Sequence, residues 1–323
     1  MAKFLVRRLL WAVFLFFAVT IITFLLFYVV PGDPAALSAG KQATQEDVAR
    51  IHAYLHLDEP IWQQYGRWLW NLVAHGSFGR SFVNRRPVSE IVLTAAPVTA
   101  GLVFGGAILW MLIAIPVGVY SALKPRSIGD RAGMVFVLIG ISAHPVWIGL
   151  IFSYFIGYKA GLTPITGYCD LFNPSEASGC GGPIDWVYHM ILPWMTFAVL
   201  FAALYVRMIR ATVMETLNED YVRTARAKGV QSAAVLKSHV LRNSMLPVVT
   251  LLGMDIGLAL GGAIFTESVF SLPGLGRTVV QAYDASDLPT ISGIVVFSAI
   301  CVIVFNIFVD LLYAFLDPRI TLT

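Results

Sequence analysis

Long apolar runs separated by polar segments dominate the chain. Six of these runs are long enough to cross a bilayer, since a helix needs about 20 residues to span the hydrocarbon core. A backbone exposed to lipid must satisfy its own hydrogen bonds, so each run is predicted to be a helix. The runs cover approximately residues 9–30, 98–123, 132–158, 187–206, 246–266 and 291–315.

This pattern predicts one all-α polytopic membrane domain with six transmembrane helices. We expect residues 1–30 to form the first helix with its basic start, and residues 31–97 to form an extracytoplasmic helical loop. A five-helix core is expected over residues 98–315, including a polar loop at 213–245, and residues 316–323 are expected to form a cytoplasmic tail. A hydrophobic fraction of 58% and a mean hydropathy of +0.76 exclude an ordinary soluble domain.

The positive charges predict the orientation of this domain. The short loops on one side carry only Lys159 and Arg277, and most other basic residues fall on the opposite side. Cytoplasmic loops are enriched in Lys and Arg, so both termini are predicted to be cytoplasmic. The net charge of +3 is therefore a topology signal, whereas nucleic-acid binding would require a basic face on a soluble fold. The basic residues on the cytoplasmic side are Lys3, Arg7, Arg8, Lys124, Arg126, Arg131, Arg207, Arg210, Arg223, Arg226, Lys228, Lys237, Arg242 and Arg319.

A cleavable signal peptide is the alternative interpretation of the first run. The basic start fits that alternative, but the apolar run is longer than a signal-peptide core. The residues that follow, Pro31-Gly32-Asp33, do not form a small-x-small cleavage site. We therefore expect a retained helix.

The loop between the first two runs has helical periodicity. Thr44 and Asp47 resemble a capping box that opens a helix extending to about residue 55. Pro60 is placed to open a second helix, because proline is tolerated at a helix start. A helix lying on the outer leaflet is the expected structure, since aromatic residues suit the lipid headgroup layer. The tryptophans concerned are Trp62, Trp68 and Trp70.

The polar segment at residues 218–247 is the most informative part of the chain. Asn218 is a favourable N-cap, acidic residues follow it in the first turn, and basic residues precede Gly229, which supplies a left-handed stop. A second helix is predicted to start at Ser232. Two such short helices have no core of their own, so contact with another protein is their expected use.

Several short motifs occur in an order that resembles a known family. Ala225-Arg226-Ala227-Lys228-Gly229, followed by Leu246-Pro247, is similar to the cytoplasmic coupling loop of bacterial ABC importer permeases in their dipeptide/oligopeptide/nickel branch. The opening motif resembles the B-type subunit of the permease pair. The remaining motifs are Arg7-Arg8-Leu9, Pro31-Gly32-Asp33-Pro34, Gly79-Arg80-Ser81, Arg86-Pro87-Val88, Thr266-Glu267-Ser268-Val269-Phe270, Pro273-Gly274-Leu275-Gly276, Asp310-Leu311-Leu312-Tyr313 and Leu316-Asp317-Pro318-Arg319.

The resemblance implies a non-catalytic permease subunit of an ATP-driven importer in a bacterial cytoplasmic membrane. The implied partners are a second permease subunit, two ABC ATPase subunits, an extracytoplasmic solute-binding protein and the lipid bilayer, with no nucleic acid. This chain has no phosphate-binding loop, so ATP and magnesium are expected on the ATPase subunits, with no cofactor or metal bound here. The residues expected to contact the ATPase subunit are Asp220, Tyr221, Arg223, Thr224, Ala225, Arg226, Ala227, Lys228 and Gly229.

The resemblance also implies a substrate class and an outward docking surface. Di- or oligopeptides delivered by the binding protein are expected, with nickel chelates or another small solute as alternatives. The loop at 31–97, together with residues 270–289, is the implied landing surface, with no contact residue singled out. An ion-coupled secondary transporter is the alternative of a different class, but it usually contains inverted repeats, and no clear internal repeat is present.

One departure from the family pattern concerns the coupling loop. The widest consensus contains Glu-Ala-Ala, whereas this chain offers Tyr221-Val222-Arg223 or Arg223-Thr224-Ala225, depending on the alignment. The small residues Thr224, Ala225, Ala227 and Gly229 are expected to seat closely in a partner cleft. Their exact register is open by a few positions.

Two ionisable residues inside the apolar runs are candidates for the translocation path. A carboxylate such as Asp255 is costly at the middle of a span, so it faces a wet cavity or a polar partner. Contact with a substrate amino group or cation, and a structural pair with a neighbouring helix, are both open. His144 precedes Pro145, which is predicted to bend the third run, and is either a neutral core residue or a ligand.

Other residues in the spans have packing or anchoring interpretations. A glycine face in the fifth run is expected to allow close packing against another helix, such as one from a second permease subunit. It consists of Gly253, Gly257, Gly261 and Gly262. Arg207, Arg210 and Asp310 lie near the membrane interface, where anchoring is their expected role.

The cysteines leave one question open. Cys169 and Cys180 fall in the same outward loop, where oxidising conditions permit a disulfide. A disulfide and two free thiols are equally consistent with this sequence. Cys301 lies in the last run and is interpreted as a small apolar residue.

Overall fold

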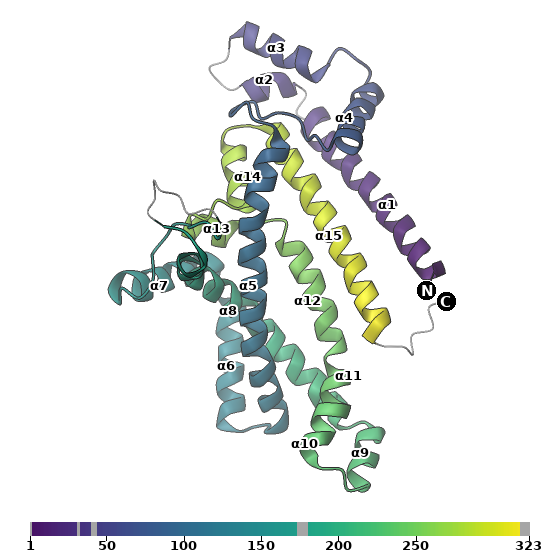
Figure 1. Cartoon of the computed structure of the whole chain (residues 1–323), viewed down its shortest axis with the longest axis vertical. Coiled ribbons are helices and arrows are strands. Elements are labelled where there is room, and N and C mark those ends of the chain that lie inside the picture. Colours follow the sequence, from purple (N-terminus) through teal and green to yellow (C-terminus); the bar gives the residue numbers. More distant parts are fainter. Residues whose placement is uncertain (1, 31–32, 40–43, 173–179, 317–323) are drawn as a thin grey trace.

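The structure, a computed structural model, describes residues 2–30, 33–39, 44–172 and 180–316. Within these ranges the chain is built of helices and contains no β-strand element. The predicted all-α fold is confirmed. Figure 1 shows long helices crossing the middle of the molecule, with short helices gathered at its two opposite ends.

In the part of the chain that the structure describes, four helices are long and apolar enough to cross a membrane by themselves. They are α1 (Ala2–Phe24), which continues as the π-helical turn η1 (Leu25–Val29), and α5 (Val88–Leu123), α8 (Pro183–Leu217) and α15 (Leu288–Leu316).

Two further spans are each broken into a bent pair. The first pair is α6 (Ile128–Ser142) and α7 (Pro145–Phe152), the latter continuing as η2 (Ser153–Lys159), with a bend of 110°. The second pair is α12 (Leu246–Ala259) and α13 (Ile264–Phe270), with a bend of 57°. The six predicted spans are found when each bent pair is counted as one.

Local chemistry explains the first break. Pro145 lacks a backbone N–H and opens α7, so the predicted bend is confirmed, although it separates two helices instead of curving one. His144 is the N-cap of α7, and its Nδ1 accepts a hydrogen bond from the Val146 amide at 3.3 Å. The imidazole thus satisfies a backbone donor that the break would otherwise leave without a partner.

Two helices extend beyond their predicted boundaries. α5 begins at Val88, so the outward loop predicted for 31–97 is shorter than expected, and Pro97 lies inside the helix. α8 continues to Leu217, inside the polar loop predicted for 213–245. The apolar signal of a span stops at the membrane surface, whereas backbone hydrogen bonding continues into water until a residue caps the helix.

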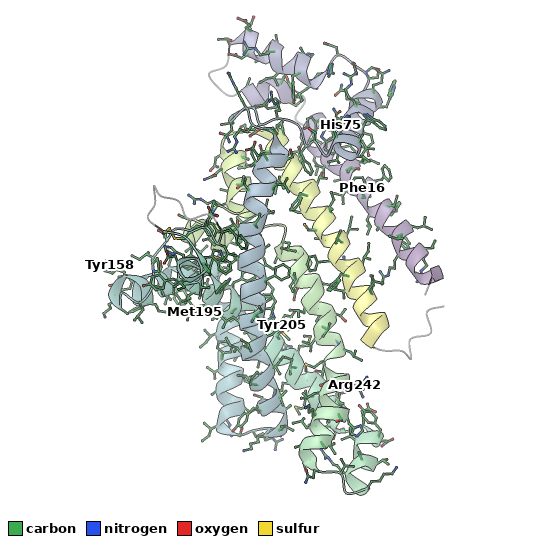
Figure 2. All side chains as sticks on the ribbon, viewed as in Figure 1. Phe16, His75, Tyr158, Met195, Tyr205 and Arg242 are labelled. Carbon is green, nitrogen blue, oxygen red and sulfur yellow. A yellow bond between two sulfur atoms is a disulfide. The ribbon has the colours of Figure 1, made fainter. Side chains whose placement is uncertain are left out.

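The centre of the fold is the packing of α8 against α5 and α6. Trp110 of α5 is fully buried and stacks on Phe201 of α8, with ring centroids 4.6 Å apart. Tyr205, one turn further along α8, lies 5.8 Å from the same indole ring and is 1% exposed; Figure 2 shows it in the middle of the bundle. Close packing of this kind is what holds helices together in lipid, where apolar burial gives little driving force.

The glycine face of α12 packs against α15 of the same chain. A Cβ atom added at Gly253 would lie 1.8 Å from Cγ2 of Val309, and one at Gly257 would lie 3.1 Å from Cβ of Phe305. The expectation that this face meets a second permease subunit is therefore wrong. The residues do allow close helix approach, as predicted, but the neighbouring helix is intramolecular.

The outward end carries four short helices. They are α2 (Pro34–Ala39), α3 (Gln45–Leu55), α4 (Ile61–His75) and α14 (Leu275–Asp284). Figure 1 shows α2 and α3 beyond the ends of α1, α5 and α15.

The predicted starts of α3 and α4 are confirmed. The side chain of Thr44 accepts a hydrogen bond from the Asp47 amide at 3.2 Å and forms the reciprocal capping box. Pro60 is the N-cap of α4. Trp68 of α4 packs on Phe24 of α1 at a centroid distance of 6.0 Å, and therefore fixes α4 across the end of the first span.

The cysteines of the outward loop are bridged. Cys169 and Cys180 form a disulfide, with their Cα atoms 5.7 Å apart. Cys169 is buried, and its Sγ lies 3.3 Å from Nδ1 of His189 near the start of α8. Cys301 is a free, half-buried thiol.

Replacing Gly253 by alanine tests the close approach of α12 and α15. The added methyl group overlaps Val309, and overpacking of this kind costs about 1–3 kcal/mol. We expect a lower thermal unfolding midpoint for the purified protein. The additional change Val309→Ala should restore it.

The control is Gly66→Ala on α4, where a Cβ meets nothing within 4 Å. This variant should be as stable as the wild type or slightly more so, because alanine favours helix over glycine. Equal destabilisation by both alanine substitutions would contradict close packing at Gly253.

The disulfide predicts a specific labelling pattern. Alkylation of the denatured, unreduced protein should modify Cys301 and leave Cys169 and Cys180 unmodified. Reduction before alkylation should add both remaining labels. Labelling of Cys169 and Cys180 without reduction, measured by peptide mass spectrometry, would show that the bridge is absent.

Candidate functional site

The polar loop forms a compact helical tip at the cytoplasmic end. It consists of α9 (Asp220–Ala227), α10 (Ser232–Val235), the π-helical turn η3 (Leu236–Leu241) and α11 (Arg242–Ser244). Figure 1 shows this tip at the end of the molecule opposite to α2 and α3. It lies between α8 and α12 in the sequence and therefore joins two of the spans.

The start of α9 differs by one residue from the prediction. Glu219 is its N-cap, whereas Asn218 ends α8 and donates from Nδ2 to the Met214 carbonyl at 3.0 Å. The sequence could not reveal this because α8 was expected to end earlier. With α8 reaching Leu217, α9 follows it after a single tight turn.

The end of α9 is as predicted. Gly229 has a φ of +78°, in the left-handed region that favours glycine. Its amide donates to the Arg226 carbonyl at 3.0 Å, and the Val230 amide donates to the Ala225 carbonyl at 3.3 Å. These two bonds form a Schellman motif. The helix therefore has defined ends without any partner.

α9 has one buried face and one exposed face. Val222 is fully buried and Ala225 is 8% exposed. Both belong to one buried apolar cluster that continues through Val240 of η3 into α8 and α5. The expectation that Ala225 seats in a partner is therefore wrong, because helical periodicity turns it toward its own chain. The other residues expected at this contact are exposed: Asp220, Tyr221, Arg223, Thr224, Arg226, Ala227, Lys228 and Gly229.

Polar contacts also hold α9 in place. The Asn243 side chain donates from Nδ2 to the Tyr221 hydroxyl at 2.7 Å, joining α9 to α11. Arg223 lies 3.9 Å from Asp220 on the same helix, an exposed pair that contributes little to stability. Arg226 and Lys228 have no carboxylate partner within the described residues, so the exposed face of α9 is cationic.

A buried ion pair joins α6 to α8 on the same side of the membrane. Asp130, 4% exposed, accepts hydrogen bonds from Nε and Nη2 of Arg210 at 2.8 and 3.1 Å. The Arg126 amide also donates to Asp130 at 2.8 Å. Arg210, for which anchoring at the membrane interface was predicted, thus has an intramolecular partner on α6. Sequence spacing could not show that an acid 80 residues away meets it.

Both candidates for the translocation path have intramolecular contacts. The Tyr205 hydroxyl donates to Oδ2 of Asp255 at 2.6 Å, and Asp255 is half-buried. The ring of His144 lies edge-on to Phe265, with centroids 4.8 Å apart. The two candidates therefore contact different elements. Among the described residues, no three His, Cys, Asp or Glu side chains are grouped as a metal site requires.

Asp310 is paired across two peripheral helices. Arg8 of α1 donates to Oδ1 of Asp310 on α15 at 2.6 Å. The pair is partly exposed, so screening by solvent limits its contribution. It places the start of the first span beside the end of the last span, which agrees with the predicted location of both termini on one side.

Sequence reasoning missed the structural role of Glu267. Its carboxylate is fully buried and accepts hydrogen bonds from the Thr99 hydroxyl at 2.8 Å and from the Arg277 amide at 3.0 Å. The Thr99 oxygen in turn accepts from the Leu275 amide at 2.8 Å. Glu267 thus joins α5, α13 and the first turn of α14. Its only sequence signal was its place in a family motif.

Comparison with protein-family models accounts for almost the whole chain. Residues 114–322 match the binding-protein-dependent transport system inner membrane component, and residues 1–103 match the N-terminal part of the membrane component of such systems.

Relatives align over nearly their full length. The dipeptide transport system permease protein DppB of Escherichia coli (strain K12) is 38% identical over 336 residues, covering 99% of each chain. A Brucella abortus (strain 2308) protein named for a peptide transport system permease is 37% identical over 324 residues, again covering 99% of each. A Brucella ovis protein named for a peptide permease is 38% identical over 326 residues and covers 100% of each.

These matches and the apolar spans agree with a multi-pass protein of the bacterial inner membrane. The resemblance seen in the coupling-loop and flanking motifs is confirmed. The chain belongs to the family of inner-membrane permease components of binding-protein-dependent transport systems.

Proposed function

We propose that the chain is one of two permease subunits in an ATP-driven importer of di- or oligopeptides. Two ATPase subunits supply the energy, and an extracytoplasmic binding protein supplies the peptide. The names of the full-length relatives support the peptide substrate. The observation that carries the proposal is α9, a defined cationic helix fixed to the membrane core with its polar face exposed.

α9 is suited to transmit motion from a partner. It follows α8 after one tight turn, and its buried face shares one apolar cluster with α8 and α5. A push on α9 therefore moves α8 as a rigid body. Such a push can shift a pathway between inward-open and outward-open states if the ATPase subunits bind α9 differently in their two states.

The chemistry of nucleotide hydrolysis belongs to the partners in this proposal. ATP and magnesium bind the ATPase subunits, and this chain contributes no catalytic residue, cofactor or metal ligand. The exposed residues of α9 provide the contact, with Arg226 and Lys228 directed to acidic groups of the ATPase. An arginine is well suited to this role because its planar fork binds carboxylates in a bidentate manner.

The alternative role for the cationic tip is attachment to anionic lipid. A helix that lies on lipid has a broad apolar stripe on the face away from its polar residues. The apolar residues of α9 are instead buried against its own chain, at Val222 and Ala225. The exposed face is polar, which favours protein contact.

Asp255 is proposed to act in helix packing, through its hydrogen bond from Tyr205, and not as the group that recognises the peptide. The bond joins α8 to α12 inside the membrane region. A carboxylate with such a donor needs no substrate to stabilise it. The same bond would also hold the two helices together when α8 moves.

Charge reversal on α9 tests the proposed coupling. Arg226→Glu should lower peptide-stimulated ATP hydrolysis by the assembled transporter by about tenfold or more, since an interfacial arginine often contributes about 2 kcal/mol. The matched control is Arg131→Glu, an exposed basic residue at the other cytoplasmic turn. The Arg131→Glu variant should retain peptide-stimulated ATP hydrolysis. An equal loss of peptide-stimulated ATP hydrolysis in both variants would favour attachment to lipid and contradict the proposed contact between α9 and the ATPase.

Two conservative substitutions test the role of Asp255. Asp255→Asn and Tyr205→Phe should each lower the thermal unfolding midpoint, because the first weakens and the second removes this hydrogen bond, and a buried group that loses its partner costs about 1–3 kcal/mol. Peptide uptake at a temperature where both variants are folded should stay within about twofold of wild type. Loss of uptake in Asp255→Asn alone, with Tyr205→Phe active, would instead show direct substrate recognition.

A further inference from the structure

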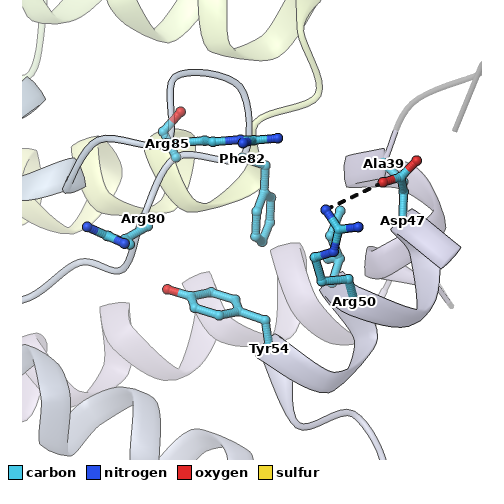
Figure 3. Close-up of a pocket in the computed structure, with 9 residues that line it drawn as sticks. Ala39, Asp47, Arg50, Tyr54, Arg80, Phe82 and Arg85 are labelled. Atoms are coloured by element: carbon cyan, nitrogen blue, oxygen red, sulfur yellow. Dashed lines mark ion pairs between the residues drawn. The ribbon is translucent and has the colours of Figure 1, made fainter.

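A hollow of ≈ 460 Å³ opens at the outward end, between α3 and the loop that joins α4 to α5. Figure 3 shows the rings of Tyr54 and Phe82 inside it, with Arg80 on one side and Arg50 on the other. The two rings are 5.9 Å apart and meet edge-on. The charged residues that line the hollow are Asp47, Arg50, Arg80 and Arg85.

The loop that carries two of these arginines is held in a defined shape. The Arg85 amide donates to the Ser81 carbonyl at 3.0 Å, which closes a tight turn. The buried side chain of Asp287, which is 3% exposed, holds this turn in place. Asp287 accepts hydrogen bonds from the Ser81 hydroxyl at 2.5 Å and from the Phe82 amide at 3.1 Å. The hollow is therefore preorganised on that side.

The positive charge of the hollow is only partly neutralised. Arg50 lies 3.7 Å from Asp47. Hydrogen bonds from Thr44 hold the pKa of Asp47 below its usual value, so this carboxylate stays ionised at neutral pH. Arg80 and Arg85 are exposed and form no ion pair with any described residue. Two arginines without an ion-pair partner among the described residues thus line one hollow, and the positive charge of Arg85 also acts on the Asp47 carboxylate.

The backbone of Arg85 has an uncommon conformation. Its φ is +56°, in the left-handed region, which a residue with a side chain adopts at a cost in free energy. Glycine or asparagine would fill this turn position more favourably. The hydrogen bonds of the turn hold Arg85 in this conformation at the rim of the hollow.

We propose that this hollow receives an acidic surface segment of the extracytoplasmic binding protein, with Arg80 and Arg85 binding its carboxylates. The inference rests on the proposed function, because it assigns a contact site to that partner. Arginine binds carboxylates through paired N–H donors, and the exposed ring of Tyr54 and the half-buried ring of Phe82 offer apolar contact beside them. The hollow lies at the outward end of the molecule, between α3, which Figure 1 shows beyond the outer ends of α5 and α15, and the loop that leads into α5. This position favours a protein in the extracytoplasmic space over a lipid headgroup.

The test is a binding measurement with the complete transporter in nanodiscs and its purified binding protein. The double variant Arg80→Gln/Arg85→Gln should raise the dissociation constant about tenfold and flatten its dependence on salt, because charge pairs at an interface add affinity that ions screen. The matched control is Arg86→Gln. Arg86 lies on the same loop but already pairs with Glu90, so its loss should change affinity by less than about twofold.

The design separates this site from the proposed function. If wild-type transporter binds no binding protein and shows no peptide-stimulated ATP hydrolysis, the proposed function fails. If wild type binds but the double variant binds equally well, the site is wrong and the proposed function stands. If Arg86→Gln lowers the affinity for the binding protein as much as the double variant does, the proposed site is also wrong. A loss in the double variant that disappears when anionic lipid is replaced by neutral lipid assigns the arginines to headgroups, which overturns the proposal as well.

Discussion

The lipid phase offers no hydrogen-bond partner to the backbone, and this constraint shapes the places where the spans are interrupted. Where α6 gives way to α7, His144 accepts a hydrogen bond from a freed amide. Where α13 turns into α14, the buried Glu267 accepts from the Arg277 amide and from Thr99. These side chains are polar because the broken backbone beside them needs partners. Their presence in apolar surroundings is thus explained by structure before any substrate is considered.

The same constraint determines how motion can pass through the molecule. Since helix ends are satisfied internally, a helix can move as a unit without exposing unpaired backbone groups. α8 connects these regions: its middle packs on Trp110 through Phe201, its inner half meets Asp130 through Arg210, and α9 follows directly. The partly buried Asp130–Arg210 pair joins α6 to α8 at this end. Breaking it would leave a buried charge unpaired.

Much of this fold is predictable from the sequence, and the failures have a common physical cause. Apolar runs locate all six spans, and local chemistry identifies the capping box of α3 and the Gly229 stop of α9, because these signals involve residues close in sequence. Contacts between residues far apart in the sequence could not be predicted from these local signals. The orientation of Ala225 toward its own core and the packing of Gly253 on Val309 each depend on which helix lies alongside. Hydropathy alone does not specify that neighbour.

The two cationic surfaces at opposite ends of the chain differ in a way that bears on function. The charge of α9 is carried by a helix whose apolar face is part of the main buried cluster, so force applied there reaches the spans. The arginines near α3 lie on a short loop held by Asp287, next to the start of α15. A partner bound at the outward end therefore acts on α15 and its neighbour α12, whereas a partner at the cytoplasmic tip acts on α8. The Tyr205–Asp255 bond between α8 and α12 is a direct polar link between these two groups of helices. Communication between the two ends can therefore pass through packed helices and this bond, without any flexible element.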